Sequence, residues 1–291
     1  MKIIVLGAGG QLGKSFVKNK LNNLDIIFFN KDDLNLLNHK LLETEIVKYK
    51  PDFLINTAAF TNVDEAENNY ELAFEINSKS LAHLSQLCDK NNVCLIHFST
   101  EYVFDGNKRG SYIEEDKTNP LSIYGKSKFE GEINIKLNTE KYFIFRISWL
   151  FSNHPKSFIN KIINKSKSNE IINVVNDQFG KPMYSDELAK IIYDFIINYN
   201  NYNPKFGLYH VSSIGNICTW YEIAKFASEY AKRKNIKFSK INKISSNQNK
   251  FFALRPKNSC LNDRKFKIIS KFKQINWKKH LVNVLEETLG K

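Results

Sequence analysis

Short apolar runs alternate with amphipathic segments through the first half of the chain. Consecutive apolar residues predict a strand buried on both faces, whereas apolar positions three and four apart predict a helix. Strands are predicted at residues 2–10, where the run ends in a glycine turn, and at 25–30, 52–59, 93–100 and 142–148. Helices are predicted at 11–21, 41–50, 65–91 and 124–136. This alternation requires a parallel sheet with helices on both faces, a Rossmann-type doubly wound α/β fold.

The pattern becomes less regular beyond Trp149. Helices are predicted at residues 156–168, 185–200 and 220–234, a short strand at 171–177, and a polar, loop-rich segment at 236–262. We therefore expect a dinucleotide-binding Rossmann domain at residues 1–150 and a mainly substrate-binding, smaller α/β lobe at 151–291. Segments at about 170–200 are expected to return to the Rossmann domain.

Composition places the chain among ordinary globular proteins, with 42% hydrophobic and 25% charged residues. The apolar stretches are too short for a signal peptide or a membrane span, so we expect a cytoplasmic protein with no membrane partner. The cysteines form no C-x-x-C pair, and we expect free buried thiols at Cys88, Cys94, Cys218 and Cys260.

A net charge of +13 raises the question of nucleic-acid binding. Only five of the 43 basic residues are arginine, and the lysines are scattered among asparagine and isoleucine rather than gathered in one stripe. This distribution favours a solvated surface over a nucleic-acid site. The charge is suited to attracting an anionic small substrate.

A glycine-rich turn follows the first predicted strand. Gly7, Gly10 and Gly13 are spaced as G-x-x-G-x-x-G between that strand and a helix. Glycines allow a tight turn there and let backbone N–H groups approach a pyrophosphate at the helix N-terminus. The alternative is a purely structural turn, but the position in a βαβ unit favours dinucleotide binding.

The residue that ends the second strand bears on the choice of cofactor. An acidic side chain there would bind the ribose 2′-hydroxyl of NAD, whereas this chain has Asn30 followed by Lys31. Lys31 is placed to face a 2′-phosphate, which favours NADPH over NADH. A solvated surface lysine is the alternative.

Tyr124 and Lys128 begin a predicted helix, one turn apart on the same face. An ammonium beside a phenol favours the phenolate, and we expect Lys128 to lower the pKa of Tyr124 towards a useful range. Such pairs are common by chance. Thr100, however, ends the fourth predicted strand 24 residues earlier, at the sheet edge where ligands bind. The set predicts a hydride-transferring oxidoreductase with Thr100, Tyr124 and Lys128 as catalytic residues.

These features resemble the extended short-chain dehydrogenase/reductases, and further blocks resemble the dTDP-4-dehydrorhamnose reductase family within that class. The blocks are DLNLL at 33–37, NTAAFTNVDEAE at 56–67, FSTEYVFDG at 98–106, YGKSKFEGE at 124–132, RISWLF at 146–151, VVNDQFGKP at 174–182 and LRPKNSCL at 254–261. The resemblance implies NADPH- or NADH-dependent reduction of the 4-keto group of dTDP-4-dehydro-L-rhamnose, a dTDP-linked deoxy keto-sugar.

The resemblance also implies roles for individual residues. The expected cofactor contacts are Gly10, Gln11 and Leu12 at the phosphates, Asn35 and Leu36 near the adenine, and Ala59, Phe60 and Thr61 along the cofactor. The expected substrate contacts are Thr100 and Glu101 at the sugar, Trp149, and Arg255 at the diphosphate. Trp149 as a core residue and Arg255 as a structural ion pair are the alternatives.

Three positions depart from the family pattern. The family usually has Asp at the positions of Glu101 and Asn35. It has an acidic residue at the position of Asn30, which ends the second strand. Because Glu101 lies at the expected sugar site, the substrate could be a related nucleotide sugar, and the chain could be a related reductase or epimerase. A further alternative is a non-catalytic subunit that binds nucleotide. We expect no metal in the chemical step, and a homodimer is one assembly compatible with the family.

Overall fold

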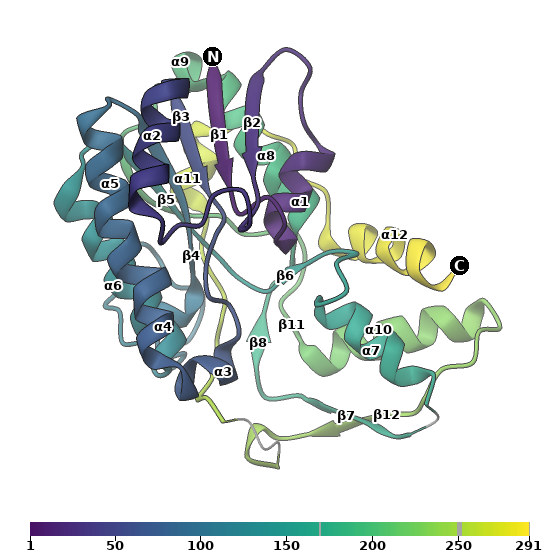
Figure 1. Cartoon of the computed structure of the whole chain (residues 1–291). Coiled ribbons are helices and arrows are strands. Elements are labelled where there is room, and N and C mark those ends of the chain that lie inside the picture. The colour runs from purple at the N-terminus through teal and green to yellow at the C-terminus, as the bar shows by residue number, and fades with distance from the viewer. Residues whose placement is uncertain (169, 249–251, 291) are drawn as a thin grey trace.

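A parallel sheet forms the centre of the larger lobe (Figure 1). The computed structural model describes residues 1–168, 170–248 and 252–290, and within them this sheet has six strands in the order β10-β5-β4-β3-β1-β2. Its strands are β1 (Lys2–Leu6), β2 (Asp25–Phe29), β3 (Phe53–Asn56), β4 (Cys94–Thr100), β5 (Tyr142–Ile147) and β10 (Gly207–His210). The predicted α/β class and parallel sheet are confirmed. β10 lies in a segment where the hydrophobic pattern indicated no element.

Helices cover both faces of the sheet, each with its own apolar core. On one face α1 (Gln11–Lys18) packs against α8 (Ser185–Ile197), and Phe16 and Tyr193 belong to the same buried cluster. On the other face lie α2 (His39–Tyr49), α5 (Ser80–Lys90) and α6 (Ile123–Asn138). The chain therefore changes face at β1, which pairs with both β2 and β3. Ligands bind at the carboxyl ends of strands at such a switch point.

The single helix predicted at 65–91 is wrong in detail. The structure has α3 (Val63–Asn68), α4 (Tyr70–Phe74), the π-helix η1 (Glu75–Lys79) and then α5. Asn69 leaves helical geometry with φ −125° and ψ 49°, which ends α3. The π-turn packs so closely on α6 that a Cβ on Gly131 would lie 2.1 Å from the Asn77 carbonyl oxygen. Packing of this kind is not visible in hydrophobic periodicity.

The smaller lobe consists of helices around short strand pairs (Figure 1). Its helices are α7 (Phe158–Ser166), α10 (Trp220–Arg233) and α12 (Trp277–Leu289). The strand pairs are β6 (Leu150–Phe151) with β9 (Met183–Tyr184), β7 (Ile172–Val175) with β12 (Ile241–Ile244), and β8 (Phe179–Gly180) with β11 (Cys218–Thr219). The remaining short helices are η2 (Glu101–Val103), α9 (Tyr199–Tyr202), η3 (Ser246–Gln248) and α11 (Arg264–Ile269).

The second half of the chain has more regular structure than its hydrophobic pattern predicts. The segment predicted as loop at 236–262 contains β12 and η3. Its polar residues 241–244 form a strand because they pair with β7. Residues 249–251 of that segment lie outside the described residues. The segment 170–200 divides, with α8 on the large sheet and β7 on β12. The boundary between two domains at residue 150 stays a prediction.

All four cysteines are buried free thiols, as predicted. Of the helices described, none combines the length and apolar character that crossing a bilayer requires.

Candidate active site

The glycine turn after β1 is held by close backbone packing. Gly7 has φ +77°, and a Cβ on it would lie 2.7 Å from the Ala58 nitrogen. A Cβ on Gly13 would lie 2.1 Å from the Gly7 carbonyl oxygen, so neither position accepts a side chain. Gly10 donates its N–H to that same oxygen at 2.9 Å and caps α1 without a side chain. The first turn of α1 carries no acidic residue, so its N-terminal N–H groups suit a pyrophosphate.

The predicted cofactor side chains at the ends of β1 and β2 also have structural contacts. Gln11 donates from Nε2 to the Leu150 carbonyl at 3.1 Å, and this bond links α1 to β6. Leu12 and Leu36 are buried in the two cores that flank the sheet. Asn35 Oδ1 accepts the Leu37 N–H at 3.0 Å. The buried side chains of Leu12 and Leu36 thus serve the cores, whereas Gln11 and Asn35 remain partly exposed.

Asn30 shapes the turn after β2, and Lys31 extends from it. Asn30 Oδ1 accepts the N–H groups of Asp32 at 2.8 Å and Asp33 at 3.2 Å. This turn leaves Lys31 exposed.

A residue that sequence reasoning missed supports the segment after β3. Asn77 of η1 accepts the Phe60 N–H at 2.8 Å and donates to the Phe60 carbonyl at 3.0 Å. Its Nδ2 also lies 3.0 Å from Ser127 Oγ on α6. Asn77 thus connects the predicted cofactor segment of Ala59, Phe60 and Thr61 to α6, which carries the predicted catalytic residues. The signal available in the sequence was weak, because Asn77 is one of four asparagines within the predicted helical stretch 65–91.

The start of α6 is pressed against η2, and this brings the predicted catalytic residues together. Ser122 caps α6 by accepting the Gly125 N–H at 3.2 Å, and Glu67 accepts the Ile123 N–H at 2.9 Å. A Cβ on Gly125 would lie 2.3 Å from the Tyr102 carbonyl oxygen, so glycine is needed for this approach. Tyr124 consequently lies in the first turn of α6, directly beside Thr100 at the end of β4.

Thr100 and Glu101 form a buried polar pair. Thr100 Oγ1 donates to Glu101 Oε2 at 2.9 Å and accepts the Tyr102 N–H at 3.2 Å. Burial raises the pKa of Glu101 to about 7, although hydrogen bonds from Thr100 and Ser259 oppose the rise. A carboxyl that is partly protonated near neutral pH therefore adjoins the hydroxyl of Thr100.

This raised pKa predicts a pH-dependent stability. The folded protein keeps the Glu101 proton up to about pH 7, whereas the unfolded chain loses it near 4.5, so stability falls as pH rises through that window. Thermal melts should show Glu101→Gln gaining about 2 kcal/mol on the wild type between pH 5 and pH 8. Glu140→Gln, at an exposed position, should show no such gain. A constant difference between wild type and Glu101→Gln would contradict the prediction.

The expected lowering of the Tyr124 pKa by Lys128 is wrong for this structure. Burial raises the pKa of Tyr124 well above its usual value, the Glu101 carboxylate raises it further, and a hydrogen bond with Thr100 opposes the rise. Lys128 Nζ instead donates to the Phe98 carbonyl at 2.8 Å and lies 2.9 Å from His97 Nε2. Its own pKa is lowered to about 7 by burial, against the attraction of Glu132. Tyr124 therefore carries its proton at neutral pH.

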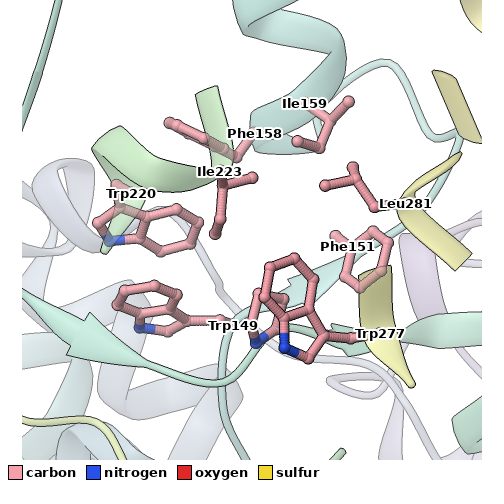
Figure 2. Close-up of a pocket in the computed structure, with 9 residues that line it drawn as sticks. Trp149, Phe151, Phe158, Ile159, Trp220, Ile223, Trp277 and Leu281 are labelled. Atoms are coloured by element: carbon pink, nitrogen blue, oxygen red, sulfur yellow. The ribbon is translucent and has the colours of Figure 1, made fainter. Parts of the chain in front are cut away.

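Trp149 joins the core of the smaller lobe. Its backbone has φ +48°, and its ring stacks on Trp220 with centroids 3.8 Å apart. Figure 2 shows these two rings lying parallel beside an aromatic and aliphatic pocket. Gly180 lies against the Trp149 ring, where a Cβ would approach to 2.6 Å. Such packing is compatible with the core alternative, and the ring sits where the chain passes from the sheet to the smaller lobe.

Arg255 forms an ion pair with Asp64 at the start of α3. Its guanidinium donates to Asp64 Oδ1 at 3.1 Å and Oδ2 at 2.8 Å, and the Ala253 N–H also meets Oδ1 at 3.1 Å. The segment around Arg255 is thereby attached to the start of α3. Two blocks that are far apart in the sequence meet at this ion pair.

Comparison with known proteins places this geometry in a family. The family described as RmlD substrate binding domain matches residues 1–289. A dTDP-4-dehydrorhamnose reductase of Aggregatibacter actinomycetemcomitans is 32% identical over 289 residues, which cover 97% of this chain and 98% of that protein. The chain belongs to the dTDP-4-dehydrorhamnose reductase family. The resemblance inferred from the sequence blocks is therefore confirmed.

Solved structures of the dTDP-4-dehydrorhamnose reductase family have the same fold. One from Clostridium acetobutylicum superposes with a TM-score of 0.90 at 31% identity, with full coverage of both chains. Another, from Bacillus anthracis in complex with NADP, superposes with a TM-score of 0.89 at 32% identity over 99% of each chain. The sheet described here is thus the Rossmann-type sheet of that family.

Proposed function

We propose that this chain is an oxidoreductase that reduces the 4-keto group of dTDP-4-dehydro-L-rhamnose to give dTDP-L-rhamnose, with NADPH as preferred cofactor. Family membership supports the reaction class, and a relative in complex with NADP supports the cofactor. The observation that carries the proposal is the meeting of Thr100, Tyr124 and Lys128 at the carboxyl end of β4, with Tyr124 protonated.

The chemistry follows from these positions. NADPH, when bound, supplies a hydride to C4 of the sugar. Tyr124 donates its hydroxyl proton to the C4 oxygen, so that the carbonyl becomes an alcohol, and regains a proton from solvent. Thr100 orients that oxygen through its hydroxyl, and Lys128, one helical turn after Tyr124, would hold the nicotinamide ribose of the bound cofactor. Thr100 and Lys128 are buried, and Tyr124 is partly exposed, so its hydroxyl can meet a bound substrate.

The glycine turn and the bare N-terminus of α1 fit the cofactor pyrophosphate, with Gly7, Gly10, Gly13, Gln11 and Leu12 around it. We propose that the segment after β3 lines the cofactor and that the turn after β2 faces its adenosine, with Asn30, Lys31, Asn35 and Leu36 nearby.

Lys31 provides a test of cofactor choice. Lys31→Glu should weaken NADPH binding about tenfold, because a carboxylate would repel the 2′-phosphate, and should leave NADH binding unchanged. Fluorescence titration with each cofactor measures both constants. Lys40→Glu, an exposed lysine on α2, is the matched control. Equal losses for NADPH and NADH in Lys31→Glu would show that this lysine does not read the 2′-phosphate.

For the sugar nucleotide we propose contacts from Thr100, Glu101 and Trp149 at the edge of residues 1–150 and from Arg255 of the mainly substrate-binding lobe at 151–291. The basic surface then serves an anionic dTDP-sugar rather than nucleic acid. A related keto-sugar is a second candidate for the substrate. Glu101 supports it, because a side chain longer than the usual Asp lies beside Thr100.

The deciding assay follows NADPH oxidation with dTDP-4-dehydrorhamnose and, separately, with other dTDP-linked 4-keto sugars. Turnover of dTDP-4-dehydrorhamnose with the highest kcat/KM supports the proposal. Preference for another sugar would support the second candidate. Retained NADPH binding without any turnover would favour a non-catalytic nucleotide-binding subunit.

A further inference from the structure

A buried row of side chains runs behind the proposed catalytic lysine. Asn56, His97 and Lys128 are each at most 2% exposed. Asn56 and His97 are register partners on β3 and β4, and Asn56 Nδ2 lies 3.2 Å from His97 Nδ1. The other ring nitrogen, Nε2, lies 2.9 Å from Lys128 Nζ. The row therefore connects β3, β4 and α6 beneath the site.

The direction of the hydrogen bonds in this row is determined at one end by the backbone. The Ala58 N–H can only donate, and it meets Asn56 Oδ1 at 3.0 Å. Asn56 must then present its NH₂ group to His97 Nδ1, which has to accept. A neutral imidazole that accepts at Nδ1 carries its proton on Nε2 and donates it towards Lys128.

We propose that Asn56 and His97 are positioning residues that hold Lys128 as a neutral amine in the free enzyme and so set the pH at which Lys128 takes up its proton. A neutral amine accepts the His97 proton through its lone pair, donates one N–H to the Phe98 carbonyl and keeps one N–H for the site. An ammonium would instead face a donor at Nε2. The catalytic consequence rests on the function proposed above for Lys128.

The charged and titratable surroundings agree with this assignment. Burial lowers the pKa of His97 well below its usual value, so the imidazole is neutral, and an ammonium at Lys128 would lower that pKa further. Facing Lys128 on its own helix are Tyr124 and Glu132, and Glu132 is already bonded to Arg146 of β5. Glu101 of η2 faces Tyr124. The carboxylate nearest to Lys128 is therefore committed elsewhere.

Asn56→Asp should reverse the direction of the hydrogen bonds in this row, because aspartate has nearly the same shape as asparagine. A carboxylate at position 56 would accept both the Ala58 N–H and a proton on His97 Nδ1. His97 would then present the bare Nε2 to Lys128, which favours the ammonium. Replacing one amide nitrogen by oxygen thus predicts a change of tautomer in His97 and a change of charge on Lys128.

Long-range ¹H–¹⁵N correlation spectra report histidine tautomers directly and need no turnover. The chain has six histidines, and the His97 signals are assigned by their loss in His97→Gln. At pH 7 we expect His97 protonated on Nε2 in the wild type and on Nδ1 in Asn56→Asp. A wild-type His97 that is protonated on Nδ1, or on both nitrogens, overturns the proposal even if Asn56→Asp does not fold.

The effect on Lys128 is measured by NADPH affinity as a function of pH, and by kcat/KM where the enzyme turns over. The ionisation of Lys128, lowered by burial to about pH 7 in the wild type, should move up by about one unit or more in Asn56→Asp. Asn160→Asp, which adds a carboxylate at another buried asparagine, should leave it in place. A changed tautomer with an unmoved ionisation overturns the proposal. If the enzyme shows no turnover but its NADPH affinity depends on pH as expected, the proposed reaction is refuted and the proposal for Asn56 and His97 stands.

Discussion

Replacing Tyr124 by phenylalanine is expected to lower kcat by roughly 10²–10⁴-fold while leaving NADPH affinity within about twofold. The ring and its packing against Tyr102, with centroids 5.4 Å apart, would remain. Only the hydroxyl proton that we propose is given to the C4 oxygen would be lost. Burial and Glu101 keep that hydroxyl protonated at neutral pH, so the substitution removes a proton that is available for the transfer. Stopped-flow reduction of the sugar nucleotide gives kcat, and fluorescence titration gives the affinity.

Tyr209→Phe is the matched control for this substitution. Its hydroxyl donates to the Lys205 carbonyl at 2.6 Å from β10, on the same sheet. Loss of that bond should reduce stability by about 1 kcal/mol and leave kcat unchanged. If Tyr124→Phe retained more than a tenth of wild-type kcat, Tyr124 would not be the proton donor.

Glu132→Gln is expected to cost about 3–5 kcal/mol of folding free energy, the largest effect on stability that we predict. Glu132 is fully buried on α6 and accepts two bonds from Arg146, at 2.8 and 2.6 Å, as well as the Ser99 hydroxyl at 2.5 Å. Glutamine would turn an N–H group towards the guanidinium and leave its charge buried without a counterion. Thermal unfolding should occur roughly 6–20 °C lower.

Glu43→Gln removes a carboxylate from an exposed pair with Lys90 and serves as the control. That substitution should leave stability nearly unchanged, since water screens the pair. A fall of less than about 2 kcal/mol in Glu132→Gln would mean that Arg146 finds another partner or water, and that the pair does not anchor α6 to β4 and β5.

The parts of the site that could be predicted from sequence depend on local geometry. Gly7 and Gly13 are needed for a turn only a few residues long, and Tyr124 and Lys128 face one way because four residues make one helical turn. Thr100 could be placed at the sheet edge because parallel strands end together. The strands themselves followed from apolar runs that must be buried on both faces.

The tertiary structure decided the electrostatics of the same residues. Lys128 was expected to act on Tyr124, but it is bound by His97 and Phe98 of a strand 30 residues away in sequence. The π-turn that places Asn77 likewise packs on Gly131 of α6, a contact between segments far apart in the sequence. Spacing along a chain determines which side chains share a face. Burial and the partners contributed by distant strands determine the protonation state, because both depend on contacts between residues far apart in the sequence.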